Sequence, residues 1–137
     1  MPPAERHLIW FLRLSAVMFF CAAPFVFVPT AWMRPIAAWY GLELPDAPLL
    51  EYLIRSVSAG YAMLGAMYWW ISRDVGRYLP LLWFNAMASL VYDAVVIGIG
   101  VMVPLPALWT ISEAVSMTIW TLTMMWLLWR LQGEYQR

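Results

Sequence analysis

The chain has 137 residues, of which 64% are hydrophobic and only 12% are charged, and its formal net charge is zero. Soluble domains are about half apolar and about a quarter charged, so this composition excludes an ordinary soluble domain and indicates a membrane protein. No run of basic residues is present that would favour nucleic-acid binding. The single cysteine, Cys21, excludes an intrachain disulfide.

The hydrophobic runs predict an all-α integral membrane protein, an antiparallel bundle of four transmembrane helices that forms one membrane domain over residues 1–137. A transmembrane helix needs roughly 20 residues, so four spans and short connections would use the whole chain. We expect spans at about residues 8–28, 47–72, 78–100 and 105–131, with an interfacial helix at about 30–41 between the first two.

The first predicted span is flanked at its start by Arg6, His7 and Arg13. Its apolar run is longer than the hydrophobic region of a signal peptide, so we expect it to be retained as a span. Pro24 lies late in this span and is expected to kink it, and Pro29 is expected to help to end it.

The connection from Pro29 to Leu50 has two halves of different character. The first half carries Trp32 and Trp39 around a single basic residue, Arg34, which is typical of a helix that lies in the membrane interface. The second half is acidic and rich in turn-forming residues. Asp46 at its end is a predicted N-cap for the second span.

The second span carries a face of small side chains around one full charge, namely Arg55, Ser58, Ala59, Ala62, Gly65 and Ala66. Small residues at this spacing let another helix approach closely, and packing alone is enough to explain them. Arg55 is therefore predicted to lie on a packed face and not on the lipid face.

The third and fourth spans contain the other ionisable groups that are expected inside the membrane. On the third span, Asn85, Ser89 and Asp93 recur at helical spacing on one face. On the fourth, Glu113 and Trp120 lie along one stripe, and Trp120 is expected either to line a pocket or to fill the core.

The arginines predict the orientation of the bundle. Six of the eight belong to the two ends of the chain and to the connection between the second and third spans, namely Arg6, Arg13, Arg73, Arg77, Arg130 and Arg137. Basic residues collect on the cytoplasmic side, so both termini are expected to be cytoplasmic. We expect the protein to reside in the inner membrane of a bacterium.

With this orientation, the charges within the spans fall in the outer half of the bilayer, and they predict a polar cluster of Arg55, Asp93 and Glu113. Glu51 lies one turn above Arg55, and Asn85 and Ser89 extend the cluster inward. Unpaired charges at this depth are costly, which favours pairing of the guanidinium with a carboxylate. Two readings stay open: a clasp that fixes helix register, or a site that binds a ligand or handles protons.

The residues do not favour a catalytic or metal-binding site of the usual kinds. The only histidine, His7, is expected at the membrane surface, and no cysteine lies near the cluster, so the usual nucleophile–base pairs and metal ligand sets are missing. No catalytic residue, metal or cofactor is predicted.

Read as a unit, the stretch RSVSAGYAMLGAMYWWISRDVGRYLP resembles small four-span bacterial membrane proteins of the DoxX-like and BphX-like kind. The resemblance covers roughly residues 50–130. It lies in Arg55 at the opening of the second span, the small-residue face, the short turn with Arg73, Asp74 and Arg77, and the acid Glu113 early in the fourth span. It implies the four-span architecture and an accessory role in membrane redox complexes, and it transfers no catalytic residue.

Three functions are therefore considered. The first is a non-catalytic accessory or stabilising subunit of a larger membrane assembly, whose partners are the lipid bilayer and other membrane subunits or further copies of the chain. The second is a binder or carrier of a small hydrophobic molecule, such as a quinone, lipid or pigment, with its polar head at the cluster. The third is a proton-coupled transporter or membrane enzyme that uses Asp93 or Glu113 as acid or base.

Overall fold

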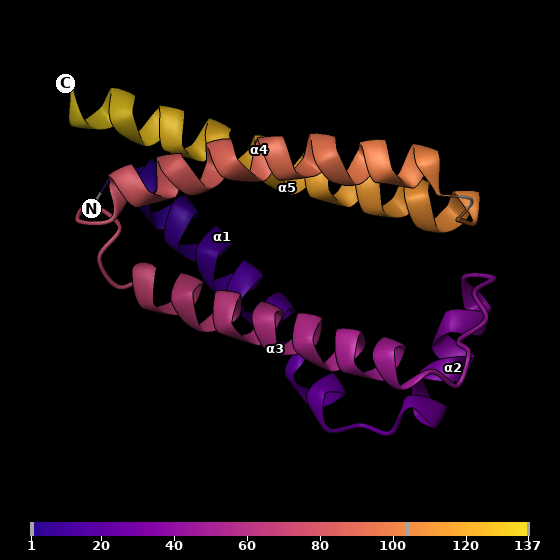
Figure 1. Ribbon diagram of the computed structural model, residues 1–137. Helices are drawn as coiled ribbons and strands as arrows, with labels where there is room; N and C mark the ends of the chain where they lie inside the picture. The colour runs from indigo at the N-terminus through magenta and orange to yellow at the C-terminus, as the bar shows by residue number, and fades with distance from the viewer. Residues whose placement is uncertain (1, 104, 137) are drawn as a thin grey trace. The chain divides into compact units, whose positions relative to one another are not determined.

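The computed structural model describes residues 2–103 and 105–136, and these residues form helices joined by turns, with no strand among them. Arg137, which the orientation argument counts, lies outside the described residues. In chain order the elements are α1 (Pro3–Phe20), the short 3-10 helix η1 (Ala23–Val26), α2 (Thr30–Trp39), α3 (Pro48–Ile71), α4 (Leu79–Met102) and α5 (Ala107–Tyr135) (Figure 1). The predicted all-helical class is confirmed.

The helix boundaries agree with the predicted segments to within a few residues, except in the first. There the α-helix ends at Phe20, and after a turn the chain continues as η1. The cause is Pro24, because a proline ring clashes with the carbonyl four residues earlier and has no N–H to donate. Prolines also stand at the starts of η1, α3 and α4, where the missing N–H costs nothing.

Within the described part of the chain, three helical segments are long and apolar enough to cross a membrane: Pro3–Val26, Leu79–Met102 and Ala107–Tyr135. The helix α3 is not among them, although it has 24 residues. Its charged pair Glu51 and Arg55, together with its serines, glycines and aromatic side chains, lowers its hydropathy. The finding fits an integral membrane protein with three such helices.

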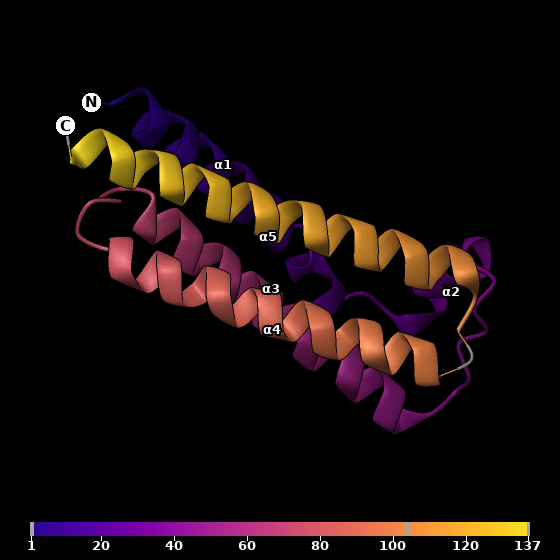
Figure 2. The same ribbon diagram turned by 90° about the horizontal axis from the view of Figure 1, so that it is seen from above.

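The chain divides into two compact units. The terminal unit comprises Met1–Phe11 and Arg73–Arg137, and the central unit comprises Leu12–Ser72. In the terminal unit, α4 and α5 lie side by side and run in opposite directions (Figure 1, Figure 2). Their buried side chains include Leu82 and Ala86 of α4 and Met124 and Leu128 of α5.

In the central unit, the second half of α1 packs closely against α3. A Cβ added at Gly65 would lie 2.9 Å from the carbonyl oxygen of Ala16, so only a glycine permits this approach. Beside it, the ring of Phe19 stacks on Tyr61 and Tyr68 with centroids 5.7 and 5.6 Å apart. The predicted packing role of the small-residue face is therefore seen at Gly65 and at the buried Ser58.

The helix α2 has two faces that differ in exposure. Met33 and Ala37 are buried, whereas Trp32, Ile36 and Trp39 are 72%, 51% and 77% exposed. The exposed set follows the i, i+4, i+7 spacing of one helical stripe. Gly41 ends the helix with a positive φ of 73°, and the N–H groups of residues 41 and 42 bond back to the last turn.

Candidate functional site

The best-defined polar contact within a predicted span joins Asp93 of α4 to Thr121 of α5. The Thr121 hydroxyl donates a hydrogen bond of 2.7 Å to Oδ2 of Asp93. Asp93 is only 6% exposed and Thr121 only 1% exposed. A buried carboxylate without a donor is costly, so this bond stabilises the α4–α5 pair and fixes its register.

Sequence reasoning placed Asp93 inside the third span, on one face with Asn85 and Ser89, but did not identify Thr121 as its partner. Thr121 is one of several hydroxyl side chains in the fourth span, each of which can bond either its own helix or a neighbour, so the sequence does not single it out. The nearby Thr123 bonds its own helix, because its hydroxyl donates to the carbonyl of Ile119 at 2.7 Å.

Glu113 lies on the same helix as Thr121 but at a different level. It precedes Thr121 by eight residues, which is about 12 Å along the axis of α5. Since Asp93 bonds Thr121, the carboxylates of Asp93 and Glu113 belong to separate levels of the α4–α5 pair. Glu113 is half-buried, and its own carbonyl accepts the hydroxyl of Ser116 at 2.9 Å.

The remaining predicted residues of the terminal unit are half-buried. Asn85 and Ser89 precede Asp93 on α4 at four-residue spacing, on the same face. Trp120 packs against Phe11 of α1, with ring centroids 5.7 Å apart and an angle of 34° between the planes. In this unit Trp120 therefore serves as core packing between α5 and the first half of α1.

Arg55 of the central unit is paired within its own helix. Its Nη2 donates to Oε1 of Glu51 one turn earlier, and both side chains are partly exposed. Its Nε is buried and has no hydrogen-bond partner within residues 2–103 and 105–136. Since Arg55 belongs to one unit and both Asp93 and Glu113 to the other, the predicted three-residue cluster remains a prediction.

The start of α3 corrects one prediction. The N-cap of α3 is Ala47, and no side chain caps it. Asp46 forms an ion pair with Arg34 of α2 instead. The predicted N-cap role of Asp46 is therefore wrong, because a neighbouring guanidinium offers the carboxylate a charged donor. A hollow of about 210 Å³ lies beside this pair, lined by Thr30, Pro45, Asp46, Ala47, Pro48 and Glu51.

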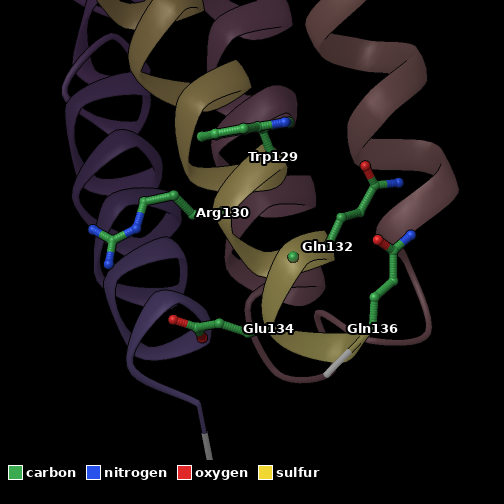
Figure 3. Close-up of a pocket in the computed structure, with 6 residues that line it drawn as sticks. Trp129, Arg130, Gln132, Glu134 and Gln136 are labelled. Atoms are coloured by element: carbon green, nitrogen blue, oxygen red, sulfur yellow. The ribbon is translucent and has the colours of Figure 1, made fainter.

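A second hollow, of about 480 Å³, surrounds the C-terminal turns of α5. In Figure 3, Arg130 and Glu134 point toward α1, whereas Gln132 and Gln136 point to the opposite side. The backbone N–H of Ala4 donates to Oε2 of Glu134 at 3.0 Å, so the last turn of α5 caps the first turn of α1.

Arginines near the helix ends lie over aromatic rings. Arg130 lies 5.0 Å from the ring centroid of Trp126, and in the central unit Arg13 lies 5.7 Å from that of Trp69. The Nε of Arg13 also donates to the Ser72 hydroxyl at 3.5 Å. An arginine over an aromatic face is attracted by the negative charge of the ring face. Sequence reasoning predicted a position at the membrane surface for these arginines, and it did not predict their aromatic partners.

In comparisons with protein-family models, curated proteins and solved structures, nothing matches this chain.

Proposed function

We propose that the chain is a four-span integral membrane protein that acts as a non-catalytic accessory subunit of a larger membrane assembly. In this proposal α3 is the additional span. Its 24 residues extend about 36 Å, more than the roughly 30 Å of a bilayer core. Its two charges, Glu51 and Arg55, lie in its first two turns and neutralise one another, which limits the cost of inserting them.

The proposal includes cytoplasmic termini and residence in a bacterial inner membrane. The supporting observation is the arginine distribution of the sequence, with Arg6, Arg73, Arg77 and Arg130 on the proposed cytoplasmic side. The resemblance of residues 50–130 to DoxX-like proteins is part of the same proposal and favours an accessory role.

The observation that carries the accessory role is the outward face of α4. Opposite the side that packs on α5, Val91 and Val95 are 65% and 54% exposed, and the small residues Ala94 and Gly98 of the same face are exposed too. A Cβ added at Gly98 would meet nothing within 4 Å. Close helix approach in membranes uses small residues four apart in this way. Meanwhile the carboxylate of Asp93 accepts a hydrogen bond from Thr121 within the same helix pair.

Native mass spectrometry of the protein, extracted gently from its own membrane, tests this role. We expect co-purifying membrane subunits, or further copies of the chain, in fixed stoichiometry. The variant Gly98→Leu should reduce that association, whereas Gly133→Leu should not, because it places the same side chain in open space near the end of α5. A monomer without partners in gentle extraction, or equal association of both variants, would refute the accessory role.

The second candidate is a binder of a small hydrophobic molecule, and the buried Nε of Arg55 favours it. An N–H without an acceptor is costly, and the oxygen of a bound quinone or lipid head would satisfy it. The same mass spectra decide this case. One defined small-molecule mass that is retained by the wild type and lost in Arg55→Gln supports binding; no such mass at any extraction strength excludes it.

The clasp that would pair Arg55 with Asp93 or Glu113 forms part of the four-span proposal. Asp93 bonds Thr121, which follows Glu113 by eight residues or about 12 Å along α5, so we expect the guanidinium to pair with one of the two acids and not to bridge both. The variants Arg55→Ala, Asp93→Asn and Glu113→Gln test it. We expect Arg55→Ala and one of the two acid variants to lower the yield of assembled protein, whereas wild-type assembly of all three would exclude the clasp.

A further inference from the structure

The hollow between the start of α2 and the start of α3 brings together oxygen acceptors from three places in the chain. Its lining includes three residues whose side chains carry oxygen, Thr30, Asp46 and Glu51, and two prolines and an alanine complete it. All of these residues lie in the central unit. At about 210 Å³, the hollow has room for a small polar group and not for a bulky one.

Each of the two acids in the lining has an arginine as its ion-pair partner. Asp46 is paired with Arg34, and Glu51 is paired with Arg55. The bond to Asp46 uses only one of the several N–H donors of the Arg34 guanidinium, and the Arg34 side chain is partly exposed. A lone cation would be attracted by the acids and repelled by the arginines. A lone anion would be attracted by the arginines and repelled by the acids. A zwitterion matches both halves of the site at once.

The surroundings of the hollow indicate where such a zwitterion would come from. The helix α2, which carries Arg34, presents Trp32, Ile36 and Trp39 as one exposed apolar stripe. A helix with exposed tryptophans on one face and a charged residue nearby is suited to lie at headgroup depth. With α2 at that depth, the hollow at its first residue, Thr30, would lie beside the polar heads of lipids.

We propose that this hollow binds the headgroup of a phosphatidylethanolamine lipid. The ammonium group donates hydrogen bonds to Asp46, Glu51 and Thr30, and the phosphate accepts hydrogen bonds from Arg34. Phosphatidylcholine has no N–H on its nitrogen, and phosphatidylglycerol has no ammonium group, so neither satisfies both halves of the site. The site is independent of the accessory role, because it uses neither α4 nor a partner subunit.

The test is native mass spectrometry of the full-length protein titrated with the three lipids, with Asp46→Asn compared against Glu43→Gln. Glu43 is a suitable control, because it is an exposed acid of the same connection that does not line the hollow. We expect phosphatidylethanolamine to bind most tightly and to bind roughly tenfold more weakly to Asp46→Asn, with no change in Glu43→Gln. Equal binding of the three lipids, or equal binding by the two variants, would overturn the proposal.

A second variant, Arg34→Gln, covers the case in which Asp46→Asn does not fold. It removes the phosphate donor from an exposed ion pair, and such pairs contribute little to stability. We expect it to weaken phosphatidylethanolamine binding by a similar factor. Unchanged binding in Arg34→Gln would exclude the phosphate half of the site and with it the proposed headgroup.

Discussion

The close approach of α1 and α3 at Gly65 gives the sharpest prediction of stability, because a matched control lies on the same helix. In Gly65→Ala, the new Cβ would lie 2.9 Å from the Ala16 carbonyl oxygen, 3.2 Å from the Phe20 nitrogen and 3.3 Å from the Phe19 Cβ. Two of these atoms belong to the backbone of α1, so no side-chain rotation relieves the contact. In Gly60→Ala, the new Cβ meets nothing within 4 Å.

The magnitude follows from how far the helices must separate. The α1 backbone has to retreat by about 0.5 Å to bring the 2.9 Å contact to the 3.4 Å of ordinary van der Waals contact. Overpacking of this kind costs about 1–3 kcal/mol. The separation also loosens the stacking of Phe19 on Tyr61 and Tyr68, which contributes to that cost. Against it stands the gain of about 1 kcal/mol for alanine over glycine within a helix.

The assay is reversible unfolding in mixed micelles with increasing denaturing detergent, followed by tryptophan fluorescence. We expect Gly60→Ala to be as stable as the wild type or more stable by up to about 1 kcal/mol. Gly65→Ala should be less stable than Gly60→Ala by about 1–3 kcal/mol. Equal stability of the two variants would refute the close packing of α1 against α3.

Two further predictions concern hydrogen bonds between helices of the terminal unit. Thr121→Val should lower the free energy of unfolding by about 1–2 kcal/mol, because it leaves the buried Asp93 without its donor. Thr123→Val is the control, since its hydroxyl bonds only its own helix, and an equal loss in both variants would contradict the assigned role of Thr121. Glu134→Ala should loosen the first turn of α1 by about 0.5–2 kcal/mol, because Ala4 N–H loses its acceptor. Hydrogen exchange at the first turn of α1 measures this, and protection equal to that of the wild type would count against the cap.

The sequence alone predicts the helices with little ambiguity. Apolar runs of about 20 residues predict helices of membrane-spanning length, and the prolines at their edges mark where the helices begin. The same pattern places Asp93 within a span, where it is found buried, and it includes Gly65 in a small-residue face, where α1 approaches closely. It also anticipates a separate short helix in the long connection, where α2 is found.

The partners of the polar side chains were decided by tertiary structure. Asp93 bonds Thr121 and not a residue at the level of Glu113, because the register between α4 and α5 sets which side chains face each other. Helical periodicity gives the face of a residue but not this register. Asp46 was predicted as a cap and pairs with Arg34 instead, because α3 begins with Ala47 at its N-cap and the fold brings a guanidinium within reach of the Asp46 carboxylate. The cap on α1 from Glu134 joins opposite ends of the chain, and no local pattern encodes so distant a pair.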